Sequence, residues 1–148
     1  MTRPPHILIV EAPYYAHIAA DLRRGAERAL AGAGATHECL SVPGAFEIPA
    51  AIATAAGAAS RFEGFVALGC VIRGETTHYE HICAESARGL QDLAVRDGLA
   101  IGYGILTVEN EAQALVRASP EGRDKGGEAV RACLALVELK RRFAQLGG

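Results

Sequence analysis

The 148-residue sequence contains no tryptophan, and aromatic residues make up only 5% of it. It also has no excess of charge of one sign: 15 Lys and Arg stand against 17 Asp and Glu, which gives a net charge of -2. A nucleic-acid partner normally requires a basic excess or a basic stripe, so this balance argues against one. Because aromatic residues are so few, the position of each Tyr and Phe is informative about the core or a binding site.

Long hydrophobic runs are also missing. No apolar stretch approaches the roughly 20 residues that a membrane span needs, and the run at residues 7–10 is too short for a signal-peptide core. The cysteines form no C-x-x-C pair; they are Cys39, Cys70, Cys83 and Cys133. We therefore expect a cytoplasmic protein whose four thiols are reduced and mostly buried.

The residues that are present favour one globular domain spanning residues 1–148. Half of them are hydrophobic and 22% are charged, which is ordinary for a chain that buries a core. Short apolar runs typical of buried strands alternate with helical periodicities along the whole sequence. The predicted strands are 6–10, 37–42, 64–72 and 99–107, and the predicted helices are 16–31, 49–56, 77–97, 110–117 and 124–146, the last with Phe143 on its apolar stripe.

This alternation predicts right-handed β-α-β crossovers. The expected fold class is α/β: three layers, α/β/α, with a central four-stranded parallel sheet, as in flavodoxin-like folds. In such sheets, ligands bind outside the carboxyl ends of the strands. The segments that follow the four strands are therefore the place to look for a site; they are 11–15, 43–48, 73–78 and 108–110.

The third of these segments is the most informative. Thr77 and Glu80 have the spacing of a capping box, which would put residues 74–76 at the positive end of a helix, where phosphate can bind to backbone amides. His78 lies at the same place and can exchange protons near neutral pH. Two alternatives stay open: an ordinary capped helix without a ligand, and a metal site formed by His78 with His81 and Glu85.

Several common motifs are absent after the predicted strands. There is no G-x-G-x-x-G, no glycine-rich phosphate loop of the P-loop type and no G-x-S-x-G. Dinucleotide-binding, P-loop and α/β-hydrolase functions therefore lose their main support. The segment at 11–15 also lacks the hydroxyl- and glycine-rich character that an electron carrier of the flavodoxin type would need.

Four strings in order resemble the lumazine synthase family, and the resemblance covers about residues 7–143. They read V-P-G-A-F-E-I-P at 42–49, L-G-C-V-I-R-G-E-T-T-H at 68–78, G-I-L-T-V-E-N at 104–110 and D-K-G-G at 124–127. The resemblance implies condensation of 5-amino-6-ribitylaminouracil with 3,4-dihydroxy-2-butanone 4-phosphate in riboflavin biosynthesis. It also implies that the reaction uses no metal and no organic cofactor.

The resemblance further assigns roles to individual residues. His78 falls on the family's proton-transfer position, Tyr14 on the ring that stacks on the pyrimidine, and Glu75 with Thr76 on the phosphate contacts. The other substrate-binding positions fall on Ala45, Phe46, Glu47, Val71, Ile72, Tyr103, Arg117 and Lys125.

The family's pockets are shared between subunits, so the resemblance implies a homopentamer in which Tyr103 and Arg117 serve the neighbour's pocket. The few residues before Ile7 favour isolated pentamers. The chain departs from the family pattern at Pro13, Tyr14 and Tyr103. A non-catalytic paralogue that binds flavin or lumazine remains the alternative function.

Overall fold

The computed structural model describes residues 3–57 and 60–147. Strands and helices alternate along the chain as the sequence predicts, apart from one added turn of 3-10 helix after the second strand. The elements are β1 (His6–Glu11), α1 (Ala16–Gly32), β2 (Thr36–Ser41), η1 (Ala45–Glu47), α2 (Ile48–Gly57), β3 (Gly64–Ile72), α3 (His78–Asp97), β4 (Ile101–Val108), α4 (Glu111–Ala118) and α5 (Lys125–Gly147).

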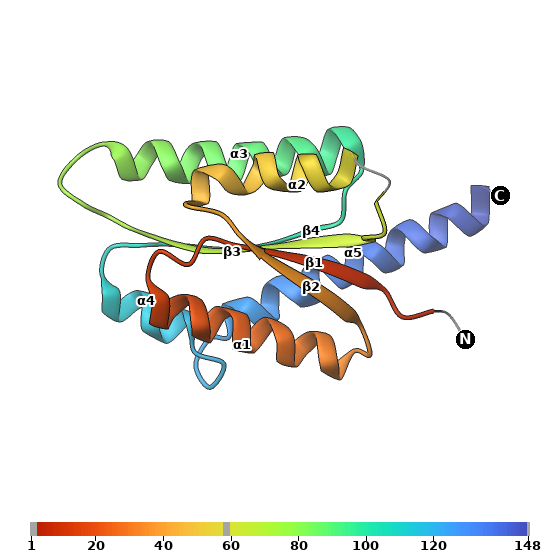
Figure 1. Ribbon diagram of the computed structural model, residues 1–148, viewed down its shortest axis with the longest axis horizontal. Helices are drawn as coiled ribbons and strands as arrows, with labels where there is room; N and C mark the ends of the chain where they lie inside the picture. The colour runs from red at the N-terminus through yellow and green to blue at the C-terminus, as the bar shows by residue number, and fades with distance from the viewer. Residues whose placement is uncertain (1–2, 58–59, 148) are drawn as a thin grey trace.

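The four strands form one parallel sheet in the order β2-β1-β3-β4. Helices α2 and α3 cover one face of the sheet, whereas α1, α4 and α5 cover the other (Figure 1). This arrangement confirms the predicted α/β/α architecture with a four-stranded parallel sheet. All four strands run the same way, so their carboxyl ends meet at one edge, and the segments that follow them are brought together there.

Strand β1 shows why the sheet is buried on both faces. Ile7 and Ile9 pack into the apolar cluster beneath α1 and α5, while Leu8 and Val10 pack into the cluster beneath α2 and α3. Successive side chains of a strand point to opposite faces, so a continuous apolar run is what a doubly covered strand requires.

Two glycines allow α5 to lie unusually close to its neighbours. A Cβ atom on Gly102 of β4 would lie 1.9 Å from the carbonyl oxygen of Ala129, and one on Gly126 would lie 2.1 Å from that of Leu22 in α1. Any larger residue at these positions would push α5 away from the sheet or from α1. The amino end of α5, where Lys125 lies, is thereby fixed against the rest of the molecule.

Two expectations about the helices were wrong. Helix α3 begins at His78 without a side-chain cap from Thr77, so the predicted capping box does not form. On α5, Phe143 is 62% exposed, because the last turns of the helix extend beyond the sheet (Figure 1). Val130, Cys133 and Val137, nearer its start, are buried.

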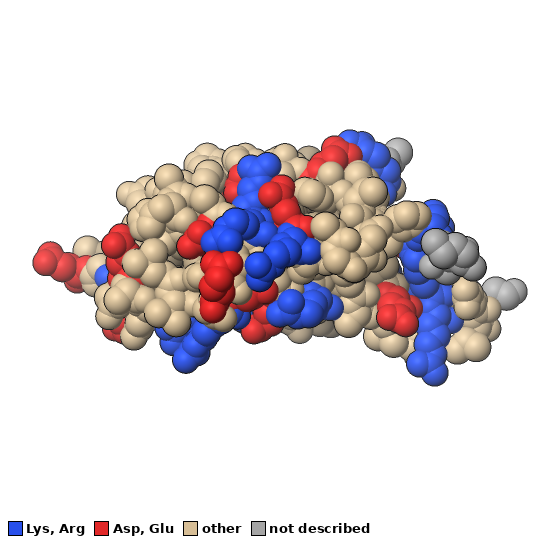
Figure 2. All heavy atoms as spheres, turned by 90° about the horizontal axis from the view of Figure 1, so that it is seen from below, with Lys and Arg blue, Asp and Glu red and all other residues tan. Residues whose placement is uncertain are grey.

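The cysteines are all free, and only Cys133 is fully buried; Cys39, Cys70 and Cys83 are half-buried. Among the described residues, no helix combines the length and hydropathy that crossing a membrane would demand. On the face covered by α1, acidic and basic side chains lie side by side (Figure 2). Examples are the ion pairs of Arg24 with Asp21 and with Glu121.

Candidate active site

A hollow of 480 Å³ opens at the carboxyl ends of β1, β2 and β3. It has the size and position of a ligand pocket in an open parallel sheet. Its walls come from the segment after β1, the segment after β2, the end of β3 and the start of α3. The lining residues are Tyr14, Tyr15, Pro43, Gly44, Ala45, Phe46, Glu47, Cys70, Val71, Ile72, His78 and Ile82.

The structure brings many of the predicted site residues together around this hollow. They come from four separate stretches of the chain, which only the parallel sheet places side by side. The predicted residues that line the hollow are Tyr14, Ala45, Phe46, Glu47, Val71, Ile72 and His78.

Two aromatic rings stand open to solvent at the hollow. Tyr14 is 76% exposed and Phe46 is 55% exposed. The ring of Tyr14 meets the edge of the Tyr15 ring, with centroids 5.0 Å apart and an interplanar angle of 74°. Exposed aromatic faces beside a cavity are suited to stacking on a flat heterocycle.

The hollow is mainly apolar, and Glu47 and His78 contribute a carboxylate and an imidazole to its lining. Glu47 ends the short helix η1, where its amide donates a hydrogen bond to the carbonyl of Gly44 at 3.1 Å. The absence of a side chain at Gly44 leaves room for the Glu47 carboxylate, since a Cβ there would lie 3.2 Å from Oε1. Of the described residues that line the hollow, none is Lys or Arg. An anionic substrate would therefore need positive charge from elsewhere.

The thiol and phenol in the lining are poor candidates for an anionic nucleophile. Burial raises the pKa of the Cys70 thiol to about 11. Burial, with a smaller effect of the neighbouring Cys70, also raises the pKa of Tyr15. Both groups therefore carry their protons at neutral pH, and Cys70 lacks the lowered pKa that reactive cysteines show.

The loop between β3 and α3 borders the hollow. Glu75 and Thr76 are exposed, and the Oγ1 atom of Thr76 accepts a hydrogen bond from the amide of His78 at 3.3 Å. This bond takes the place of the predicted cap by Thr77. The capping box also predicted that the Glu80 side chain would bond back to the start of the helix. This prediction was wrong, because the Glu80 carboxylate pairs with Arg73.

Arg73 joins this loop to the end of β4. Its amide donates to the carbonyl of Val108 at 2.9 Å, and its Nε donates to Oε2 of Glu109 at 3.0 Å. Its guanidinium also lies 4.5 Å from the centroid of the Tyr79 ring. The bond of the Glu80 carboxylate to its own amide, together with Arg73, lowers the pKa of Glu80. No role for Arg73 was predicted from the sequence.

Five predicted site residues do not line this chain's hollow, among them Glu75 and Thr76 of the loop before α3. Tyr103 is half-buried between β4 and α3, where burial raises its pKa. Arg117 lies on α4, and its Nη1 donates to the carbonyl of Gln113 at 3.1 Å. Lys125 begins α5 and pairs with Glu128 at 2.8 Å. The resemblance assigned Tyr103 and Arg117 to a neighbour's pocket.

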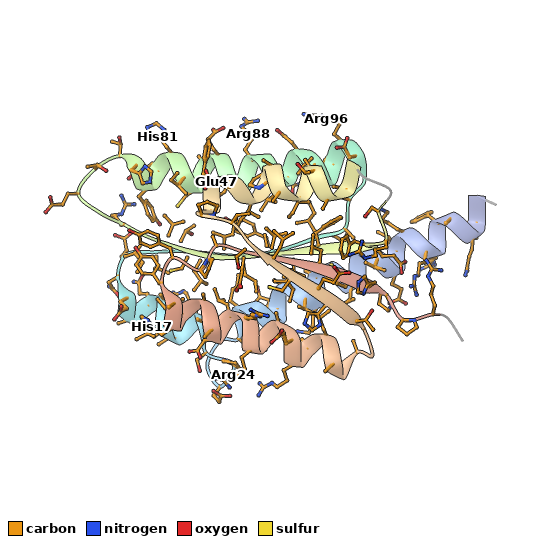
Figure 3. All side chains as sticks on the ribbon, in the orientation of Figure 1. His17, Arg24, Glu47, His81, Arg88 and Arg96 are labelled. Atoms are coloured by element: carbon orange, nitrogen blue, oxygen red, sulfur yellow. The ribbon has the colours of Figure 1, made fainter. Side chains whose placement is uncertain are left out.

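The metal alternative receives no support from the geometry. In the part of the chain that the structure describes, no three His, Cys, Asp or Glu side chains lie close enough together to hold a metal ion. His81 points outward from α3, away from the sheet (Figure 3).

Sequence reasoning missed some residues that line the hollow, among them Tyr15, Cys70 and Ile82. Tyr15 and Cys70 adjoin predicted residues in sequence, so adjacency is the signal that could have found them. Ile82 lies one helical turn after His78 on the same face of α3, which is a signal of helical spacing.

The chain is similar to known proteins over almost its whole length. The family described as 6,7-dimethyl-8-ribityllumazine synthase matches the chain over residues 4–141. A protein of that name from Sphingopyxis alaskensis is 56% identical over 138 residues, covering 93% of this chain and 96% of the relative. Another, 6,7-dimethyl-8-ribityllumazine synthase 1 from Rhizobium meliloti, is 55% identical over 145 residues, covering 95% of each.

A third relative, the 6,7-dimethyl-8-ribityllumazine synthase of Bartonella tribocorum, is 52% identical and covers 97% of this chain and 95% of its own. The family match over residues 4–141 includes every strand and helix that builds the hollow. The chain therefore belongs to the 6,7-dimethyl-8-ribityllumazine synthase family.

Proposed function

We propose that the hollow at the carboxyl ends of β1, β2 and β3 is where this chain makes 6,7-dimethyl-8-ribityllumazine. Family membership supplies the activity, a step of riboflavin biosynthesis. The observation that carries the assignment of the site is the convergence of Tyr14, Phe46, Glu47 and His78 on one cavity. The substrates are 5-amino-6-ribitylaminouracil and 3,4-dihydroxy-2-butanone 4-phosphate, and the compartment is the cytoplasm.

The pyrimidine substrate fits the aromatic side of the hollow. Its ring stacks on Tyr14, while Ala45 and Phe46, with the backbone of Val71 and Ile72, form the walls around it. The Glu47 carboxylate accepts hydrogen bonds from the polyol hydroxyls of the ribityl chain. Apolar walls with a few polar groups of fixed position are the usual means of orienting such a ligand.

The phosphate lies at the loop that leads into α3. Glu75 and Thr76 lie there, and the backbone amides of this loop supply donors beside the positive end of the helix dipole. No basic side chain among the described residues lines the hollow. As the resemblance to the family implies, the phosphate charge is neutralised by Arg117 of a neighbouring copy, with Tyr103 and Lys125 near the same site. The resemblance to the family further implies that the functional unit is a homo-oligomer, a pentamer.

The reaction needs no covalent attachment to the protein. The amine of the pyrimidine attacks the ketone and forms an imine with loss of water, after which phosphate leaves by elimination. The ribitylamino nitrogen then closes the second ring, again with loss of water. His78 carries protons between these steps, and Arg117 with the helix amides holds and releases the phosphate. Most of the acceleration comes from holding the two reactants together in a reactive orientation.

The direct test mixes both substrates with the purified protein and follows lumazine fluorescence against the spontaneous reaction. Formation well above that background is expected, and it should fall when His78 or Arg117 is replaced by alanine. A protein that carries bound flavin and adds nothing to the spontaneous rate would instead be a non-catalytic flavin- or lumazine-binding paralogue, and the proposal would fail.

A further inference from the structure

Arg73 is the meeting point of three segments around the site. It follows the last residue of β3, and its side chain bonds Glu109 after β4 and Glu80 on the first turn of α3. Its guanidinium also packs over the ring of Tyr79, again on α3. A single side chain therefore joins the loop of residues 73–77 to the helix that begins with His78.

The contacts continue from Glu109 into α4. The amide of Glu109 donates to Oε1 of Gln113 at 2.8 Å, and the carbonyl of Gln113 accepts from Nη1 of Arg117 at 3.1 Å. Asn110 caps the same helix, because its side chain accepts from the amide of Gln113 at 2.9 Å. The segment that carries Arg117 is thus connected to Arg73 through Glu109 and Gln113.

We propose that Arg73 is a positioning residue for the condensation, holding the loop before α3 and His78 in fixed relation to the start of α4 and Arg117. The inference rests on the proposed function, because it takes His78 and Arg117 as site residues. If Arg117 contributes to the pocket of a neighbouring copy, then Arg73 connects a subunit's own pocket with the residue that completes the neighbour's pocket.

The chemistry of the side chain explains why arginine suits this place. A guanidinium offers donors in a fixed planar fork, so it can bond two carboxylates and stack on a ring at once. A lysine ammonium is a compact charge on a flexible stem and cannot reproduce this arrangement. Exposed ion pairs add little to stability, so the value of this one lies in the geometry that it fixes.

The chain itself contains a matched control at the opposite end of the sheet. Arg61, which precedes β3, donates from Nε and Nη2 to the Glu38 carboxylate at 2.8 and 2.6 Å. Its guanidinium lies 4.8 Å from the centroid of the Phe62 ring. The two arginines have the same kinds of partner, yet Arg61 lies far from the hollow.

The experiment compares Arg73→Ala with Arg61→Ala in steady-state kinetics and thermal melting. For Arg73→Ala we expect KM for 3,4-dihydroxy-2-butanone 4-phosphate to rise about tenfold and kcat to fall about tenfold, since small misplacements of reacting groups are costly. Arg73→Lys should fall between the wild type and Arg73→Ala. Arg61→Ala should show the same change in melting temperature with unchanged kinetics. Equal kinetic constants for the two alanine variants would overturn the inference.

Two further variants test separately the bond of Arg73 to Glu80 and its bond to Glu109. Glu80→Ala should chiefly lower kcat, because Glu80 lies on the turn that begins with His78. Glu109→Ala should chiefly raise KM for the phosphate substrate. Because Arg73 and Glu109 act as one unit, the double variant should have no higher KM than Arg73→Ala alone, whereas multiplying effects would contradict the inference. These two variants carry the test if Arg73→Ala does not fold.

The assay also distinguishes this inference from the proposed function. His78→Ala and Arg117→Ala are measured beside Arg73→Ala. If neither of those variants alters kcat or KM, the proposed site fails. If both alter the kinetics and Arg73→Ala does not, the role of Arg73 alone is wrong.

Discussion

The two ends of the sheet carry similar side chains in opposite arrangements. At the amino end, the Phe62 ring stacks on His6 with centroids 5.3 Å apart and lies 6.1 Å from Phe65. At the carboxyl end, Tyr14 and Phe46 leave most of their surface open beside the hollow. In a chain with so few aromatic residues, rings that leave most of their surface exposed beside a cavity indicate a place for another molecule.

The same contrast applies to the arginines. Arg61 closes an ion pair at the amino end, while Arg73 joins two carboxylates from different segments at the carboxyl end. We therefore expect the contacts of Arg61 to stabilise the fold at the amino end, and the similar contacts of Arg73 to position the site at the carboxyl end. Substitutions at the carboxyl end should change kinetics more than stability, and those at the amino end should do the reverse.

The largest kinetic effect is expected for His78→Ala. General acid–base help from a single side chain amounts to about 10²–10⁴-fold, and we expect a loss of kcat near the lower limit because proximity supplies most of the rate. Single-turnover and steady-state fluorescence assays check this. Complete loss of turnover in a correctly assembled variant would contradict the dominance of proximity.

Arg117→Ala should come next. Removing a cation that bonds phosphate should raise KM for 3,4-dihydroxy-2-butanone 4-phosphate about tenfold or more, since hydrogen bonds to charged groups contribute about 1.5–3 kcal/mol. The KM for the pyrimidine substrate should change little. An unchanged KM for the phosphate substrate would remove Arg117 from this role.

A matched pair of ring deletions tests the comparison of the two ends directly. Phe46→Ala should weaken binding of the pyrimidine substrate by about two- to tenfold, as expected for the loss of an aromatic contact, and leave the melting temperature nearly unchanged. Phe62→Ala should leave KM unchanged and lower stability by about 1–3 kcal/mol, because a half-buried ring is lost. The reverse outcome would show that the two ends were interpreted the wrong way round.

The smallest expected effect is the pH dependence of stability that Glu38 causes at the amino end of the sheet. Hydrogen bonds from Arg61 and His6 hold the pKa of Glu38 at about 2, below its ordinary value of 4.5. A lowered pKa stabilises the fold above pH 4.5, and this contribution is lost as the pH falls toward 2. The difference in melting temperature between wild type and Glu38→Gln should therefore shrink over that interval. A constant difference would contradict the role of the charged pair.

Much of the fold could be predicted from the sequence because hydrophobic periodicity reports burial. The run at 64–72 and the helix that follows it have nearly the predicted bounds. The convergence of residues 14, 46, 47 and 78 also follows from the rule that ligands lie at the carboxyl ends of parallel strands.

The features that could not be predicted depend on which of several side chains bond to one another in the folded chain. A local sequence pattern does not contain this information. Thr77 and Glu80 have the spacing of a capping box, but Arg73 offers the Glu80 carboxylate a stronger, charge-assisted partner. Arg73 is in turn fixed by Glu109, which lies 36 positions further along the chain. Phe143 fits a helical stripe, but whether the sheet extends far enough to cover it is a tertiary property.

The most direct test of a site shared between copies mixes two damaged chains. Under the proposed function, His78→Ala impairs a subunit's own pocket, whereas Arg117→Ala impairs the pocket of its neighbour. If the two variants assemble at random from equal amounts, about one quarter of the pockets regain both groups, because the contact between successive subunits of a ring is head-to-tail. At concentrations of 3,4-dihydroxy-2-butanone 4-phosphate well below KM, the mixed assembly should then exceed the activity of either parent. Mixed rings no more active than the parents under these conditions would contradict a pocket built by two subunits.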